Sequence, residues 1–179
     1  ERHRAGREDL GQVLLAALAI LNPRHALPLV LVGRDGGTAA ALRASIAELG
    51  LDESRVRLLH EVASEDLPAV VQSSALFLYP SVVEGFGMPI VEALTCGVPV
   101  IAAAGGHLDD AGGPAARYAD PHDPTAWALA IAETTGDLTR AQAMSVKGMA
   151  WAERFDGAEV AGRLLAIYDA VLDQRALPG

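Results

Sequence analysis

Residues 84–93 read EGFGMPIVEA, in which two glycines precede a proline and an apolar run. The preceding residues 75–79, ALFLY, are apolar and favour a strand. The apolar residues after Pro89 have helical character and end at Gly97, and residues 98–101 (VPVI) resume as a strand. The stretch therefore predicts a strand, a glycine loop, a helix and a second strand, which is the repeating unit of a parallel sheet covered by helices.

The junction between the glycine loop and the helix predicts an anion site. The first helical turn leaves backbone N–H groups without partners, and the helix dipole places partial positive charge there. Pro89 suits the first turn because its φ is already helical. Gly85 and Gly87 have no Cβ, so that a ligand can lie against the backbone. We interpret this junction as a phosphate site.

Two carboxylates frame the loop, Glu84 ahead of it and Glu92 about one turn into the helix. Glu92 is placed to accept hydrogen bonds from ribose hydroxyls, and Glu84 from a sugar beyond the phosphates. Phosphate, ribose and sugar together indicate a sugar nucleotide. Taken singly, each glutamate is more simply explained without a ligand, Glu84 as a solvated loop residue and Glu92 as an exposed residue that stabilises the helix dipole.

The same strand and helix pattern extends through the chain. Apolar β-prone runs at 29–33 and 56–59 predict two more strands, and the first ends in a glycine turn at 34–37 that is able to admit a nucleotide. Helices are expected from Thr38 to Gly50, after Ser64, after Asp123, and at 10–21, 138–155 and 159–172. This order predicts an α/β fold, a Rossmann-like three-layer sandwich with a parallel sheet.

Length and charge limit the classes of function. The 179 residues suffice for one domain and are few for two. The formal net charge of −9 opposes general binding to nucleic acid or to anionic lipid, so a phosphate ligand must be held locally.

Cysteine count and hydropathy give further limits. The single cysteine, Cys96, excludes an internal disulfide and is interpreted as a packing residue next to Gly97. No apolar run approaches the roughly 20 residues of a membrane span, so a cytoplasmic protein is expected. The acids and histidines at 107–110 and 120–123 lack the spacing of a metal site, and no metal is expected.

The chain resembles a known family along much of its length. EGFGMPIVEA followed by LTCGVPVIA is similar to the donor-binding signature of the retaining glycosyltransferases of family 4, which have the two-domain GT-B fold. Segments such as LPLVLVGRDGG and RVRLLHEVASEDLPAVVQSSALFLYPS resemble the C-terminal domain of that family, so the likeness runs from about Leu27 to Ile131. It implies that residues 1–179 form a single nucleotide-sugar-binding domain, one half of a GT-B fold, with its first strand missing.

The resemblance also implies roles for individual residues. Glu84, the candidate catalytic residue, would hold a hydroxyl of the transferred sugar, and Glu92 would hold the ribose. Val62 would lie beside the base, near the glycine end of the strand at Gly33. The substrate-binding positions are Arg2, Arg7, Gly33, Val62, Glu84, Gly85, Phe86, Gly87, Met88, Pro89 and Glu92.

Arg2 and Arg7 have the five-residue spacing of an Arg and a Lys that grip the diphosphate in the family. The second residue here is Arg and not Lys, no glycine follows it, and the strand that precedes the pair in the family is absent. A frayed, solvated segment at residues 1–9 is the alternative interpretation.

The expected function is donor binding in a retaining glycosyltransferase that uses a nucleotide diphosphate sugar and no cofactor. The acceptor site would belong to an N-terminal domain in the same or another chain, toward which a helix at 157–173 would reach, and this half alone would be inactive. Two alternatives remain open, a GT-B sugar-nucleotide epimerase and a non-catalytic nucleotide-sugar-binding module. No motif identifies the base, the sugar or the acceptor.

Overall fold

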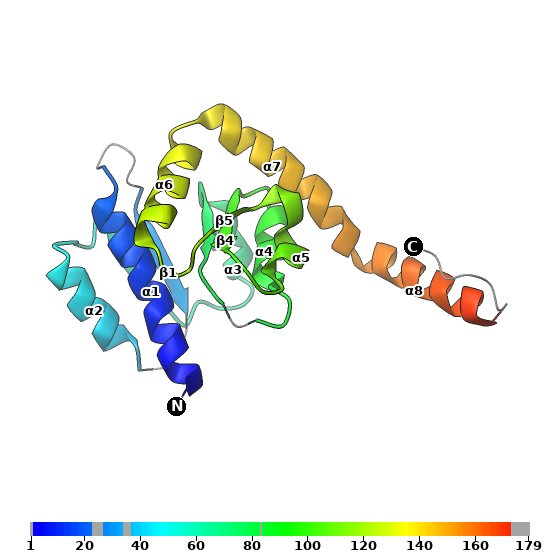
Figure 1. The fold of residues 1–179 in the computed structure, drawn as a ribbon, viewed down its shortest axis with the longest axis horizontal. Helices are drawn as coiled ribbons and strands as arrows, with labels where there is room; N and C mark the ends of the chain where they lie inside the picture. Colours follow the sequence, from blue (N-terminus) through cyan, green and yellow to red (C-terminus); the bar gives the residue numbers. More distant parts are fainter. Residues whose placement is uncertain (1, 23–26, 34–36, 83, 173–179) are drawn as a thin grey trace.

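Five parallel strands and eight α-helices make up the described part of the computed structural model, which covers residues 2–22, 27–33, 37–82 and 84–172 (Figure 1). The strands are β1 (Leu29–Gly33), β2 (Val56–His60), β3 (Phe77–Tyr79), β4 (Val100–Ala103) and β5 (Arg117–Ala119). The helices are α1 (Arg2–Ile20), α2 (Ala39–Glu48), α3 (Leu67–Gln72), α4 (Met88–Thr95), α5 (Leu108–Gly112), α6 (Pro124–Thr135), α7 (Leu138–Ala152) and α8 (Gly157–Leu172). Short 3₁₀ turns follow α5 (Gly113–Ala115) and α7 (Glu153–Phe155).

The strands pair in two sheets among the described residues. β1 pairs with β2, with Leu29 opposite Val56, and β3, β4 and β5 pair in that order. Every pairing is parallel, as the sequence predicts. The sequence gives no sign that the strands divide into two groups.

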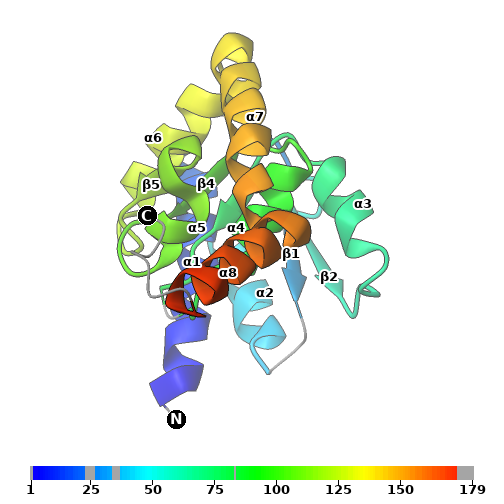
Figure 2. The ribbon, with the colours of Figure 1, turned by 90° about the vertical axis from the view of Figure 1, so that its right-hand side faces the viewer.

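Helices cover both faces of the strands. α1, α2 and α6 lie on one side, whereas α3, α4 and α5 lie on the other, as the two perpendicular views show (Figures 1 and 2). This arrangement confirms the predicted three-layer sandwich. α8 projects from the body beyond α7 (Figure 1).

The core lies between these layers and is built mainly from aliphatic side chains. All four residues of β4 are buried, and Leu15, Ile90 and Leu94 are fully enclosed. Trp127 on α6 has no exposed surface, and its indole N–H donates to the carbonyl of Asp120 at 2.9 Å. This hydrogen bond satisfies the one polar group that burial of Trp127 would otherwise leave unpaired.

Local sequence signals explain several helix starts. Asp123 caps α6 as predicted, since its Oδ1 accepts from the backbone N–H of Thr125 at 2.8 Å, and Pro124 follows. Asp137 caps α7 in the same way through the N–H of Arg140. Thr38 and Asp66 occupy the cap positions of α2 and α3 but make no side-chain cap hydrogen bond.

Three elements differ from the sequence-based expectation. α1 begins at Arg2 and not at Leu10, so the basic cluster is helical in its backbone rather than frayed. β5 and α5 were not predicted, because three and five residues are too short to show a periodic pattern. Within the described residues, no helix is both long and apolar enough to cross a membrane.

Candidate functional site

The glycine loop and α4 form the predicted strand, loop and helix. Gly87 precedes the helix in a left-handed conformation, with φ of 94° and ψ of 42°. A Cβ at Gly87 would lie 2.8 Å from Cδ2 of Leu108, a buried side chain of α5. Both conditions require glycine at this position. A Cβ at Gly85 would meet no atom within 4 Å, so the loop is open to a ligand at that residue.

The start of α4 offers fewer amides than its sequence suggests. Pro89 has no N–H, and the N–H of Ile90 donates to the carbonyl of Gly87 at 2.9 Å. Among the described residues, the Met88 N–H has no backbone acceptor. The helix start therefore presents the Met88 N–H to an anion, and the Ile90 N–H is already occupied.

Glu84 is held in place by two hydroxyl groups. Its Oε1 accepts hydrogen bonds from the Tyr79 hydroxyl at 2.8 Å and from Ser81 Oγ at 2.8 Å. Within the described part of the chain, its Oε2 makes no hydrogen bond, and the side chain is exposed. The carboxylate is therefore fixed by one oxygen and able to accept from a ligand through the other.

The sequence analysis did not assign a role to Tyr79 or Ser81. Both residues lie between the end of β3 and the glycine loop, within five residues of Glu84. The available signal was Ser81, a hydroxyl residue three positions before Glu84, although that spacing alone is common.

A cavity of about 1650 Å³ opens beside the loop. Its lining includes four of the predicted residues, Gly33, Val62, Pro89 and Glu92. They come from the ends of β1 and β2 and from the first turns of α4, which places them at the carboxyl ends of the strands, where doubly wound sheets bind ligands. Glu84, Gly85, Phe86, Gly87 and Met88 are not among the residues that line this cavity.

Phe86 anchors the loop to the C-terminal part of the chain. Its ring packs edge-on against Phe155, with ring centroids 5.4 Å apart and an interplanar angle of 71°. The side chain of Phe86 therefore has a packing role, and only its backbone is available for a ligand.

Arg2 and Arg7 both lie in α1, but their side chains fall outside the described residues.

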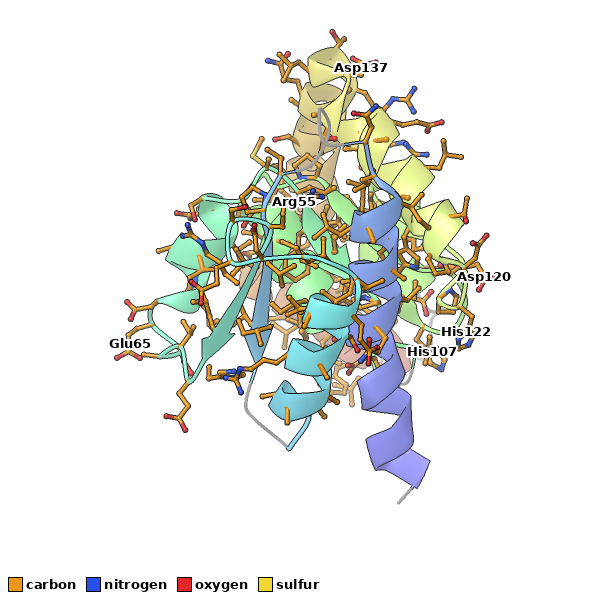
Figure 3. All side chains as sticks on the ribbon, turned by 90° about the vertical axis from the view of Figure 1, so that its left-hand side faces the viewer. Arg55, Glu65, His107, Asp120, His122 and Asp137 are labelled. Carbon is orange, nitrogen blue, oxygen red and sulfur yellow. The ribbon has the colours of Figure 1, made fainter. Side chains whose placement is uncertain are left out.

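Near the sheet's other loops, the polar residues that the structure describes form no further cluster. His107 Nδ1 and Asp110 Oδ2 lie 3.8 Å apart on the surface, and Asp120 and His122 lie on the same side of the molecule (Figure 3). In the described ranges, no three histidine, cysteine, aspartate or glutamate side chains gather as they would around a metal ion. Arg55, also labelled in Figure 3, donates to the carbonyl of Leu18 at 3.2 Å and ties β2 to α1.

Several solved structures are similar in fold to this chain. The Anabaena protein HepE in complex with UDP and glucose is 29% identical, with a TM-score of 0.74 over 85% of this chain and 43% of that one. Sucrose-phosphate synthase from Thermosynechococcus elongatus is 26% identical, with a TM-score of 0.77 over 94% of this chain and 43% of that one. The fold is therefore that of one half of a GT-B glycosyltransferase.

Curated relatives of this chain are named as glycosyltransferases. The O-antigen chain mannosyltransferase B of Escherichia coli is 36% identical over 144 residues, which are 79% of this chain and 38% of that protein. The D-inositol 3-phosphate glycosyltransferase of Corynebacterium kroppenstedtii is 34% identical over 168 residues, 88% of this chain and 37% of that protein. This chain thus spans about two fifths of the length of these relatives. Residues 4–149 match the family model of Glycosyl transferases group 1, and the chain belongs to that family.

Proposed function

We propose that this chain is the donor-binding domain of a retaining glycosyltransferase that transfers a sugar from a nucleotide diphosphate sugar to an acceptor. The observation that carries the proposal is that Gly33, Val62, Pro89 and Glu92 all line one cavity. The nucleotide would lie across the carboxyl ends of β1 and β2, with its ribose on Glu92. A structural neighbour that is 30% identical was solved with UDP-glucose, which supports this class of ligand.

The diphosphate would lie at the start of α4. The Met88 N–H, which has no backbone acceptor among the described residues, would donate to it, and the open space at Gly85 would allow close approach. Positive charge from Arg2 or Arg7 on α1 would add to the helix dipole. These groups would stabilise the negative charge that grows on the diphosphate as the glycosidic bond breaks.

Glu84 would position the sugar. Two hydroxyls hold Oε1, which leaves Oε2 to accept a hydrogen bond from a sugar hydroxyl. In the reaction, the bond between the anomeric carbon and the diphosphate oxygen breaks, and the acceptor oxygen bonds to that carbon from the same face. The acceptor proton passes to the departing diphosphate, so Glu84 is not a nucleophile in this scheme.

The acceptor site would lie in an N-terminal domain of the same or another chain. The relatives are more than twice as long as the matched region, which supports a second domain. On this proposal, residues 1–179 bind the donor and do not transfer its sugar. Thermal unfolding with UDP, GDP, ADP and their common sugars is the direct test, because a ligand that binds the folded state raises the midpoint. No shift with any of them at millimolar concentration would refute donor binding.

The ribose role of Glu92 gives a sharper test. Glu92→Gln replaces a charged acceptor by a neutral amide, so we expect the dissociation constant of the best nucleotide to rise about tenfold or more, as loss of a charge-assisted hydrogen bond predicts. Glu53→Gln is the matched control, since Glu53 is also exposed but lies ahead of β2, at the other end of the strands. Isothermal titration of both variants measures the difference. Equal affinities would exclude Glu92 from the site.

A further inference from the structure

The middle of the glycine loop is held by one side chain. Glu84 fixes the start of the loop through the two hydrogen bonds to its carboxylate, and the Gly87 carbonyl fixes its end. Gly85 and Gly87 have no side chain, so Phe86 is the one residue between Glu84 and the helix that is able to anchor the loop by packing. Glycine gives the backbone more freedom than any other residue, and the backbone on both sides of Phe86 therefore depends on this anchor.

The ring of Phe86 packs on Phe155. Both side chains are half-buried and lie against the hydrophobic core. The centroid distance of 5.4 Å and the interplanar angle of 71° are those of an edge-to-face pair, which aromatic rings favour. Phe155 belongs to the 3₁₀ turn after α7, so the contact joins the glycine loop to a segment that is distant in sequence.

The segment that carries Phe155 is itself fixed to the body of the domain. The indole N–H of Trp151 donates to the carbonyl of Ala111 at 2.9 Å, which ties the end of α7 to α5. A Cβ at Gly148 would lie 2.8 Å from Cδ2 of Leu94, so α7 and α4 are in close contact at that position. Phe155 is therefore a firm support for the loop.

The chain leaves the body immediately after Phe155. Asp156 ends the helical path with a ψ of 138°, and its Oδ1 accepts from the N–H of Ala158 at 2.9 Å at the start of α8. Among residues 157–172, only Ala170 is buried, and α8 projects from the body (Figure 1). Phe155 thus joins the glycine loop to the root of α8.

We propose that Phe155 is a positioning residue of the donor site and acts through Phe86. The contact between the two rings holds the backbone of residues 85–88 in the arrangement that presents the Met88 N–H to a diphosphate. Because Phe155 also precedes α8, donor binding and the position of α8 are coupled through it, and the coupling is reciprocal. This inference rests on the proposed function and adds to it a residue from outside the glycine loop and α4.

Backbone NMR relaxation without a ligand tests whether Phe155 holds the loop. In Phe155→Ala, we expect the order parameters of the Gly85, Gly87 and Met88 amides to fall from about 0.85 to about 0.6 or below. Phe155→Tyr keeps the ring and is expected to retain the values of the unsubstituted protein. Unchanged order parameters in Phe155→Ala would overturn the proposal.

Met149→Ala is the matched control from the same segment. Met149 is 43% exposed, and its sulfur lies 3.3 Å from the position of a Cβ on Gly97, at the end of α4 away from the loop. The substitution removes packing between α7 and that end of α4, so the loop amides should keep their order parameters. Equal loosening of the loop in Met149→Ala and Phe155→Ala would assign the effect to the packing of α7 in general, and would also overturn the proposal.

Titration with inorganic pyrophosphate tests the link to the donor site, because all nucleotide diphosphate sugars share this diphosphate chemistry. We expect the dissociation constant, followed at the Met88 amide, to rise about 2- to 10-fold in Phe155→Ala, as loss of an aromatic pair predicts. Phe155→Tyr and Met149→Ala should bind as the unsubstituted protein does. Phe86→Ala should give the same rise as Phe155→Ala, and the double variant no more than either, because the two rings act as a unit. Additive losses would mean that Phe155 acts by another route, contrary to the proposal.

Binding should also be visible at the root of α8. Pyrophosphate is expected to shift the amide resonances of Asp156 and Gly157 in the unsubstituted protein and not in Phe155→Ala. A shift at Met88 with none at these two amides would overturn the coupling. If pyrophosphate shifts no loop amide in the unsubstituted protein, the diphosphate site of the proposed function is wrong, and the role of Phe155 in donor binding falls with it. If Phe155→Ala binds pyrophosphate equally well, only the role of Phe155 is wrong.

Discussion

At the level of single residues, Gly85 and Gly87 lie in the same loop, but only at Gly87 does the fold itself exclude a side chain. Gly87→Ala introduces a Cβ at positive φ and against Leu108, which is expected to cost about 1–2 kcal/mol of folding free energy or more. Gly85→Ala meets no neighbouring atom, so stability should be retained while donor affinity falls. Urea unfolding and nucleotide titration of both variants separate the two effects. A stable Gly87→Ala protein would contradict the role of the left-handed turn.

Ser81 is expected to act through Glu84. Ser81→Ala removes one of the two hydrogen bonds to Oε1, so the sugar-dependent part of donor affinity should fall about 2- to 10-fold, which corresponds to a typical hydrogen bond. Affinity for the nucleotide without its sugar should not change. Ser54→Ala is the control, because Ser54 also donates to a carboxylate, that of Asp52, ahead of β2. An equal loss for nucleotide and nucleotide sugar would assign Ser81 a general role in folding the loop.

The site was partly readable from residue types. The glycines, Pro89 and Glu92 were predictable because their places in the loop and at the helix start depend on residues that are close in sequence. The hydroxyls on Glu84 and the contact of Phe86 with Phe155 were missed, since a side-chain partner depends on the path of the loop. In addition, the Ile90 N–H, which was expected to be free for a ligand, donates to the Gly87 carbonyl.

At the level of elements, β5 gives a pH-dependent prediction. The Tyr118 hydroxyl donates to the carbonyl of Gly113 at 3.0 Å, and burial, followed by the charges of Asp109 and Asp110, raises the pKa of Tyr118 to about 12. The unfolded chain ionises its tyrosines near pH 10, so it binds fewer protons than the folded protein between pH 10 and 12. Stability is therefore expected to fall as pH rises through this interval.

Tyr118→Phe should remove this contribution to the loss of stability at alkaline pH. Chemical unfolding of both proteins at intervals from pH 9 to 12 measures it, and Tyr168→Phe is the control because Tyr168 is 56% exposed. If Tyr118→Phe loses stability over this interval as steeply as the original protein, burial of the phenol is not the cause.

The main elements were predictable because each has its own local signal. β1 to β4 are apolar runs bounded by turns, and Asp123 with Pro124 marks the start of α6. β5 and α5 are too short for such signals and are held by tertiary contacts, among them the 2.6 Å ion pair between Arg117 and Glu133 of α6. Elements of this kind depend on the assembled fold.

At the level of the whole molecule, α8 projects from the body (Figure 1) and exposes an apolar surface. Its exposed apolar residues are Val160, Leu164, Leu165, Ile167, Tyr168, Val171 and Leu172. A continuous apolar face of this kind is characteristic of an interface. The domain organisation that the family resemblance implies would cover it with the N-terminal domain.

Leu165→Ala should therefore leave the unfolding midpoint unchanged, because the side chain is 62% exposed. Leu94→Ala, at a fully buried leucine of α4, is the contrast and should cost about 2–5 kcal/mol. Leu165→Glu should also lower the fluorescence of a bound hydrophobic dye. A large drop in midpoint for Leu165→Ala would show that α8 is packed within this domain.

The order of the strands was the least predictable property. The sequence indicates parallel strands and crossover helices, but no local signal shows that β1 and β2 pair in one sheet and β3, β4 and β5 in another.

The two tryptophans occupy contrasting surroundings. Trp127 is wholly enclosed in the core, whereas Trp151 is half-buried at the end of α7 and stacks with the guanidinium of Arg154, 4.0 Å from its ring centroid. A water-soluble quencher is therefore expected to reduce the emission of Trp151 more than that of Trp127. Intrinsic emission has a core component and a peripheral one, and the peripheral one reports on the end of α7 without an attached label.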